Sequence, residues 1–244
     1  MLYLNKSGLT KYGIDNFDSF AANFGEVVSN IEIDPTGTGY RLNKRFAKFI
    51  NIPELVKLFR QVADVVNIQD LETLNIPKRI DGQAIVTTVY PTPEMEDYID
   101  SLVARAKDLA DKKVTDLSVD NMLKITNEGR CLAVSPRLVG IQQDSPKLKA
   151  IAKDVKDIYM KYNGENGTIV GTQLLFSDLG TPKDDGSYNI YSELKEHCIA
   201  EGVPEEEIKF IHDAKTTDQR TKLIEDFNNA KFRVLIGSTP LMGN

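Results

Sequence analysis

Three short hydrophobic segments in the second half of the chain are each followed by polar residues that could take part in a ligand site. These residues are Ser177 and Asp178, His212 and Asp213, and Ser238 and Thr239. Hydroxyl and backbone N–H groups can hold phosphate oxygens without reading a base sequence. If the three segments are parallel strands, their carboxyl ends meet at one edge of a sheet, which is where open α/β sheets bind ligands. We therefore expect these residues to converge on one edge of the sheet, where the hydroxyls of Ser177 and Thr239 suit phosphate oxygens.

Each of these residues also has a simpler explanation, because Ser, Asp and Thr after a strand commonly cap the next helix. A small-molecule enzyme is a further alternative, and it would have to use His212 and Asp213 as its acid and base. The motifs of self-contained enzymes are missing from the sequence, including G-x-x-x-x-G-K-[ST], G-x-G-x-x-G, H-E-x-x-H and G-x-S-x-G. We expect no catalytic residue and no metal site in this chain.

A basic stretch from residue 41 to residue 60 is the second candidate binding surface. It carries Arg41, Lys44, Arg45, Lys48, Lys57 and Arg60 against one acid, Glu54. Apolar residues between these charges predict two short amphipathic helices, the second of which starts at Pro53. Such a basic face is usually only solvated, but here it is the best surface for phosphates. The alternative function is therefore a nucleic-acid-binding or protein-binding module that uses the face Arg41–Arg60.

The elements that must position the strand-end residues alternate along the last hundred residues. We predict strands at 172–176, 208–212 and 233–237, and helices at 145–162, 191–201 and 217–228. Apolar strands separated by helices favour parallel pairing with right-handed crossovers. The predicted fold class is α/β, an open parallel sheet with helices on both faces. Phe176 is expected to be fully buried in the first strand.

The first 75 residues are predicted to form a mostly helical insertion, and residues 76–244 the sheet-containing domain. One helix is expected to begin after Asp15 and Asn16 and to continue to Val28. Further along, the β-branched stretch 83–90 predicts a strand, and the sequence predicts a long helix at 93–112 and a short one at 120–126.

The composition limits the possible partners. The chain has 244 residues, of which 41% are hydrophobic, so it can bury a substantial core. Its formal net charge of -6 argues against binding nucleic acid by bulk charge, so any such contact must be local. The sequence shows no signal peptide and no apolar run of about 18 residues. We therefore expect a cytoplasmic protein with no membrane partner.

The strand-end motifs resemble the second RecA-like lobe of superfamily 2 helicases and translocases. The matching pieces are Gln173-Leu-Leu-Phe-Ser-Asp178, Phe210-Ile-His-Asp-Ala214 with Thr217-Asp-Gln-Arg220, and Val234-Leu-Ile-Gly-Ser-Thr239. They look like motif IV, the strand and helix that follow it, and the start of motif V. Upstream, Ile76-Pro-Lys-Arg-Ile80, the stretch Tyr90–Tyr98 and Asp144-Ser-Pro-Lys-Leu148 are similar to Swi/Snf-like DNA translocases.

A closer resemblance is to the large helicase-methylase proteins of phages, plasmids and conjugative elements. It is carried by Gly39-Tyr-Arg-Leu42, Arg45–Leu55, Asp120–Arg130 and Phe210–Ala214, which together span nearly the whole chain. Ser135 stands where this family pattern has an acid before Arg137.

The resemblance implies the second motor lobe of an ATP-dependent DNA helicase or translocase. In such motors ATP and Mg²⁺ lie between two lobes, and the second lobe contacts the DNA backbone without sequence preference. By this resemblance, the residues of the present chain expected to contact DNA are Ser177, Asp178, His212, Arg220, Ser238, Thr239 and Gly243. The first lobe, with its phosphate loop, is expected to precede Met1, and an arginine-rich motif to follow Asn244. We therefore expect no ATPase activity from this chain alone.

Overall fold

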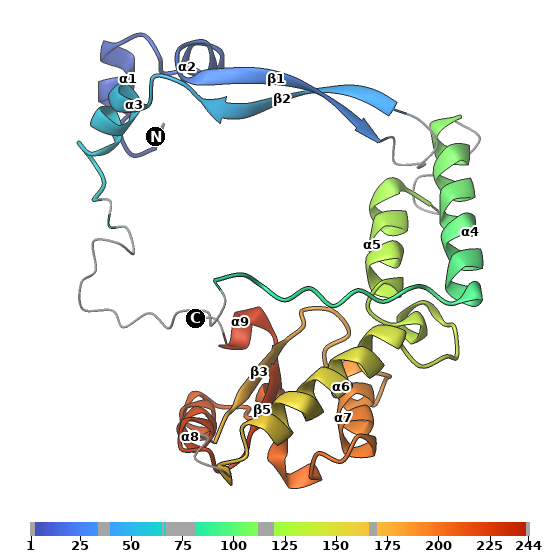
Figure 1. Ribbon diagram of the computed structural model, residues 1–244. Coiled ribbons are helices and arrows are strands. Elements are labelled where there is room, and N and C mark those ends of the chain that lie inside the picture. The colour runs from blue at the N-terminus through green and yellow to red at the C-terminus, as the bar shows by residue number, and fades with distance from the viewer. Residues whose placement is uncertain are drawn as a thin grey trace. The chain divides into compact units, whose positions relative to one another are not determined.

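The structure is a computed structural model that describes residues 3–33, 40–64, 66, 82–111, 120–165 and 170–242. Contacts divide the chain into two compact units, Met1–Ile85 and Val86–Asn244. The predicted boundary between residues 75 and 76 lies outside the described residues. Figure 1 follows the chain from the blue N-terminus to the red C-terminus.

A three-stranded parallel sheet lies at the centre of the second unit (Figure 1). Its strands are β3 (Gln173–Phe176), β4 (Ile208–Phe210) and β5 (Val234–Gly237), in the spatial order β3-β5-β4. The last strand in sequence is therefore the central one. The three predicted strands and their parallel pairing are confirmed. β4 is shorter than predicted because Ile211–Asp213 turn into a 3₁₀ helix, η5.

Helices cover both faces of this sheet, as predicted. α6 (Pro146–Lys161) and α7 (Ile190–Ala200) pack against the face that carries Val234 and Ile236. α8 (Thr217–Asn228) packs against the opposite face, which carries Leu235. In Figure 1, α8 lies on one side of the strands and α7 on the other. Side chains alternate along a strand, so coverage from both sides buries every residue of β5.

The three helices begin at polar caps that can be read from the sequence. Ser145, Asn189 and Thr216 each accept a hydrogen bond from a backbone N–H three residues later, at 3.2, 2.9 and 3.3 Å. Each cap satisfies one donor that the first turn of a helix leaves free. The predicted limits of α6, α7 and α8 are therefore correct to within one residue.

One buried cation joins the base of the sheet to α6. Arg233, which directly precedes β5, donates from Nε to the carbonyl of Gly171 at 2.9 Å and from Nη2 to the carbonyls of Tyr159 and Tyr162. Its guanidinium also lies 3.9 Å from the centroid of the Tyr159 ring. The last carbonyls of a helix lack intrahelical partners, and the macrodipole favours a cation there. Arg233 thus holds the end of α6 and the approach to β3 against β5.

Phe176 is half exposed, so the prediction that it is fully buried is wrong. The exposed fraction of its side chain is 52%. β3 is an edge strand, and its residue Leu175 packs toward α6 and α7. Alternation places Phe176 and Leu174 on the opposite face, where the apolar cluster under α8 reaches Leu235 of β5 but not β3.

Two further helices precede the sheet. α4 (Pro93–Ala110) confirms the predicted long helix, and α5 (Met122–Leu132) extends past the predicted end at residue 126. They share a small apolar core, and Arg105 of α4 pairs with Asp120 at 2.7 Å and with Glu128 of α5. The predicted strand at 83–90 is wrong, because this stretch pairs with no strand in the part of the chain that the structure describes. The remaining short elements are the 3₁₀ helices η2 (Pro136–Val139) and η4 (Glu205–Glu207), and α9 (Thr239–Met242).

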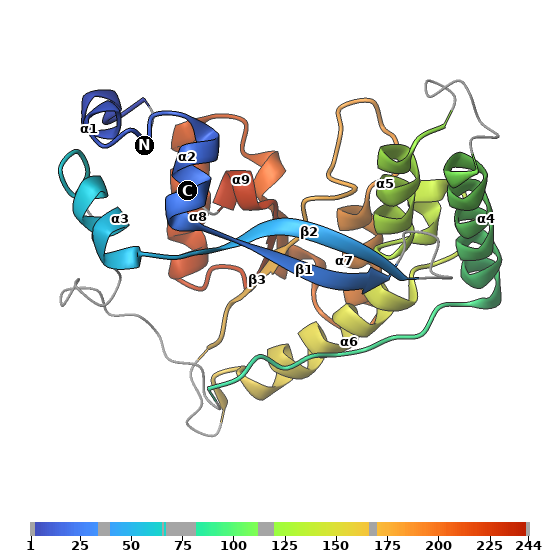
Figure 2. The ribbon, with the colours of Figure 1, turned by 90° about the horizontal axis from the view of Figure 1, so that it is seen from above.

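The first unit combines three short helices with a two-stranded antiparallel ribbon. The helices are α1 (Lys6–Lys11), α2 (Phe17–Phe24) and α3 (Ile52–Phe59), and the strands are β1 (Gly25–Ile33) and β2 (Tyr40–Phe49). The small core contains Leu9, Ile14, Phe24 and Leu58. Figures 1 and 2 both show β1 and β2 as one long twisted ribbon.

The ribbon corrects the prediction of a mostly helical insertion. The helix expected to reach Val28 ends at Phe24, where Gly25 takes an extended conformation. The stretch 41–49, predicted as a helix, is β2. In a strand, Leu42, Lys44 and Phe46 share one face, whereas the spacing of Arg41, Lys44, Arg45 and Lys48 also fits one side of a helix. Long-range pairing with the β-branched segment of β1 decides in favour of the strand.

No helix among the described residues is long and apolar enough to cross a membrane.

The burial pattern predicts unequal effects of two alanine substitutions in neighbouring strands. Leu235→Ala should lower the free energy of unfolding by about 2 to 5 kcal/mol, because Leu235 is 1% exposed and its loss leaves a cavity. Phe176→Ala should cost less than about 1 kcal/mol, because half of that ring already contacts water. Urea denaturation of the full chain, followed by far-UV circular dichroism, measures both values. Equal losses would show that α8 does not define the buried face.

Candidate functional site

The ends of β3 and β5 meet, as the sequence predicts. The Ser177 N–H donates to the carbonyl of Gly237 at 3.0 Å. The Thr239 N–H donates to Oδ1 of Asp178 at 2.7 Å. Ser177 is partly exposed, and Asp178 and Thr239 are exposed. These three residues form what we call the strand-end site.

Tyr191 of α7 connects this site to the end of β4. Its hydroxyl donates to the carbonyl of Ser177 at 2.7 Å, and its ring packs edge to face against His212 with the centroids 5.2 Å apart. The residue is fully buried. Burial, with a smaller contribution from the charge of Asp178, raises the pKa of Tyr191, so the hydroxyl stays protonated and donates. All three strand ends are therefore linked through one buried ring.

Tyr191 was missed by the sequence reasoning. It was only the first residue of a predicted helix, and nothing in the local pattern shows that its hydroxyl reaches a strand 14 residues earlier. A tyrosine at a helix start facing a buried sheet is the only available signal, since a buried hydroxyl needs a hydrogen-bond partner.

His212 supports the site without adding a positive charge. Burial lowers the pKa of His212, with Lys215 and Arg220 acting in the same direction and Asp213 opposing them. Its Nδ1 is buried and has no hydrogen-bond partner among the described residues. The carboxylate of Asp213 accepts instead from the N–H of Phe210, inside its own turn. The enzyme alternative would need His212 and Asp213 to act as an acid–base pair. In the structure no hydrogen bond between these two side chains is described.

The remaining residues predicted to contact DNA do not all lie at the strand-end site. Ser238 is buried, and its carbonyl accepts from the N–H groups of Leu241 and Met242, so it starts α9 and does not face solvent. Arg220, in the first turn of α8, donates from Nε to the carbonyl of Ala214 at 3.3 Å. Gly243 lies outside the described residues.

The predicted basic face is not a single face. In a helix, Arg41, Lys44, Arg45 and Lys48 would share one side, but β2 is a strand. Lys44 is paired with Ser29 and Arg45 with Val28, so the two neighbours lie on opposite faces of the ribbon. Lys48 is paired with an acid, Glu26. The side chain of Arg41 lies outside those that the structure describes.

A second polar cluster, which the sequence did not reveal, surrounds the buried carboxylate of Glu193 on α7. Glu193 accepts from the Ser145 N–H at 2.7 Å, from the hydroxyl of Tyr188, and from the Ser135 hydroxyl at 3.4 Å. Burial and the adjacent carboxylate raise the pKa of Tyr188, which keeps its hydroxyl a donor. This buried acid ties α7 to the start of α6.

The Glu193 cluster is better described as a hydrogen-bond network than as a metal site. Ligand atoms of Asp144, Glu193 and His197 lie within 4.8 Å of one another, which is close enough for a cation. Asp144, however, already pairs with Arg137 at 2.7 Å and Lys149 at 2.9 Å. These cations hold the pKa of Asp144 low, Lys149 most strongly. Two carboxylates against two cations leave no excess negative charge to attract a metal ion.

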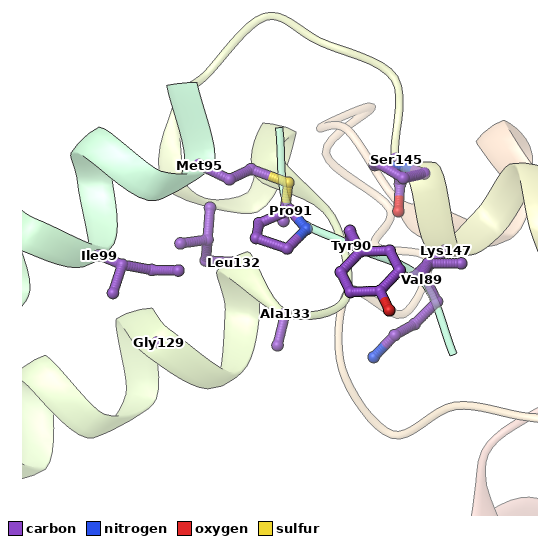
Figure 3. A pocket seen from close by; sticks show the side chains of 11 residues that line it. Val89, Tyr90, Pro91, Met95, Ile99, Gly129, Leu132, Ala133, Ser145 and Lys147 are labelled. Atoms are coloured by element: carbon purple, nitrogen blue, oxygen red, sulfur yellow. The ribbon is translucent and has the colours of Figure 1, made fainter. Parts of the chain in front are cut away.

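An apolar pocket of about 260 Å³ lies between α4, α5 and the start of α6 (Figure 3). In Figure 3, Met95 lies over Pro91, and Ile99, Leu132 and Ala133 form much of the remaining wall. The lining side chains that carry oxygen or nitrogen atoms are those of Tyr90, Ser145 and Lys147. The lining includes no carboxylate, histidine or cysteine, and the hydroxyl of Ser145 donates to the carbonyl of Val134 at 2.7 Å.

The low pKa of His212 predicts a stability change with pH. Because the pKa of His212 is lower in the folded state than the ordinary value of 6.5, the folded chain binds fewer protons than the unfolded chain as the pH falls below 6.5. The stability that the neutral His212 contributes is therefore complete above pH 6.5 and is lost as the pH falls. His212→Phe keeps a ring against Tyr191 and removes the titration. We expect wild type to lose more free energy of unfolding than the variant on acidification. The difference between the two losses should be less than about 1.4 kcal/mol per pH unit, because solvent screens the charge of His212.

Urea denaturation at pH 7.5 and 5.5 measures this difference. Carboxylates titrate in both proteins and cancel in the comparison. Equal losses in the two proteins would contradict a buried, neutral His212.

Comparisons with protein-family models, curated proteins and solved structures found no match to this chain. The proposals for its function therefore depend on the sequence motifs and on the geometry of its own residues.

Proposed function

We propose that the chain is the second motor lobe of an ATP-dependent DNA helicase or translocase of the Swi/Snf-like type. The observation that carries this proposal is the joining of the β3 and β5 ends through Asp178 and Thr239. Polar groups of the two motif-like segments thereby come together outside the carboxyl ends of a parallel sheet covered on both faces. This is the edge where open α/β sheets bind ligands. A DNA partner is consistent with the cytoplasmic location that the sequence leads us to expect.

The residues of the strand-end site take different roles in this proposal. The hydroxyl of Thr239 is a neutral donor that can contact phosphate oxygens of any sequence. The Ser177 hydroxyl donates to the carbonyl of Leu179 at 3.2 Å and would exchange that bond for a phosphate oxygen when DNA binds. Asp178 repels phosphate, so its role is to fix the turn after β5 by accepting the Thr239 N–H. His212 and Tyr191 support the strand ends from below through their packed rings. Arg220 supplies a cation at the start of α8.

The residues of this chain do not by themselves fit ATP and Mg²⁺. The sequence has no phosphate loop, and the one exposed carboxylate of the strand-end site, Asp178, is already engaged by a backbone N–H. The nucleotide would be held by a first lobe, and the present lobe would supply DNA contacts and close against it. A sheet edge with neutral donors suits a lobe that must bind and release the backbone in each cycle.

Removing the two hydroxyls tests the DNA contact. Ser177→Ala combined with Thr239→Val preserves side-chain volume at Thr239 and should weaken duplex DNA binding by about tenfold, since each lost hydrogen bond costs about 0.5 to 1.5 kcal/mol. Fluorescence anisotropy with two duplexes of unrelated sequence measures the effect, which should be the same for both.

Thr221→Val is the matched control, because Thr221 has an exposed hydroxyl bonded within α8 to the carbonyl of Thr217. A variant that binds duplex DNA as tightly as wild type, or that loses affinity for only one sequence, would contradict the proposed contact.

The chain alone should hydrolyse no ATP above background, with or without DNA, because it has no phosphate loop. Phosphate release over time measures this directly. A measured turnover that survives repurification would overturn the assignment of the nucleotide to another lobe.

A further inference from the structure

Three phenylalanine rings form an exposed cluster at the junction of α2 and the ribbon. The exposed fractions are 72% for Phe17, 37% for Phe46 and 53% for Phe49. The ring centroids of Phe17 and Phe46 are 6.5 Å apart, and those of Phe46 and Phe49 are 5.3 Å apart. Rings at these distances contact one another, so the phenylalanine cluster is continuous. Exposed aromatic rings in contact with one another are typical of a binding surface.

An irregularity in the ribbon brings Phe46 and Phe49 to the same face. Residues three apart in a regular strand point to opposite faces. Here the register shifts between Glu26 and Val27, so that Phe46 pairs with Val27 while Phe49 pairs with Gly25. The extra residue of this bulge restores a common face. Gly25 leaves the space that Phe46 fills, because a Cβ at Gly25 would overlap the Phe46 ring.

One positive charge lies on the same ribbon face as the cluster. Lys44 lies on the same face as Phe46, two residues away in the strand, and is exposed. Arg45 and Lys48 lie on the other face of the same strand. The neighbouring acids are Glu26, opposite Lys48, and Asp18, next to Phe17 in α2. Among the described side chains of this ribbon face, Lys44 is the only charged one.

These features favour an unpaired nucleic-acid strand over a second copy of the chain. A two-stranded ribbon with an exposed apolar face is marginal alone and implies a partner. A second copy stacked through the same face would bury Lys44 without an acid to pair with it, which is costly. A single strand offers both complements at once, because bases stack on aromatic rings and phosphates pair with lysine.

We propose that the phenylalanine cluster and Lys44 bind single-stranded nucleic acid, with bases stacked on Phe17, Phe46 and Phe49 and the backbone held by Lys44. This surface belongs to the first unit and contacts bases, so it is separate from the strand-end site and its phosphate contacts. Every base has a flat aromatic face, so the binding tolerates sequence. Duplex DNA, whose bases are already stacked, binds this surface weakly.

The test compares a labelled oligothymidylate of about 20 nucleotides with an abasic strand of the same length and charge. Binding to the full chain is followed by fluorescence anisotropy at about 50 and 200 mM salt. Wild type should bind the thymidylate about tenfold or more tighter than the abasic strand. Phe46→Leu combined with Phe49→Leu should remove that preference while leaving the weak abasic binding unchanged. Lys44→Gln should weaken the binding of both strands and reduce the salt dependence of that binding.

Leu42→Ala is the matched control, because Leu42 is exposed on the same face but has no ring, and it should keep the preference. Circular dichroism and sedimentation establish that each variant is folded. Equal wild-type affinity for the two strands, or an unchanged preference in the double variant, overturns the proposal. A wild-type dimer that the double variant converts to a monomer also overturns it, since the cluster is then a self-contact.

The strand-end variants separate this proposal from the motor lobe. Ser177→Ala with Thr239→Val should leave the preference for bases over abasic strand intact. If those variants lose duplex binding while the phenylalanine variants behave as wild type, the motor-lobe proposal stands and this one fails. The reverse result supports the phenylalanine cluster alone.

Discussion

The burial of Arg233 is the interaction on which the second unit depends. A buried cation is costly unless hydrogen bonds replace its water. Arg233 has no acid as its partner in the hydrogen bonds described, but three backbone carbonyls and the ring of Tyr159 surround it. Two of those carbonyls belong to the negative end of α6. The cation therefore stabilises β5 only if the end of α6 and the residues before β3 keep their positions. In this way Arg233 couples the central strand to α6 and to β3.

The two ends of the sheet consequently differ in character. The amino end is locked by a buried charge, whereas the carboxyl end is held by neutral groups and one exposed carboxylate. Tyr191 and Glu193 anchor the first turn of α7 to the carbonyl of Ser177, after β3, and to the N–H of Ser145, at the start of α6. Each contact uses a donor or acceptor that a helix or strand leaves free at its end. A rigid base with a more open functional edge is what a site needs if its residues are to be positioned and still reach a ligand.

Sequence reasoning succeeded where local chemistry decides and failed where distant pairing decides. The strands around Leu174, Phe210 and Leu235 and the helices α6, α7 and α8 were all predicted, because apolar runs and helical periodicity are local signals. The ribbon was missed because the spacing of its basic residues also fits one face of a helix.

Buried polar partners were missed for a different reason. Arg233 finds its acceptors up to 74 residues away, and Glu193 binds Ser135 58 residues away. No local pattern shows that Glu193 of α7 brings a buried carboxylate to Ser135. The cation at the base of the sheet, Arg233, is likewise committed to backbone carbonyls. The phosphate contact proposed for the strand ends would therefore depend mainly on neutral hydroxyl groups, and contacts with few ionic pairs have a weak salt dependence.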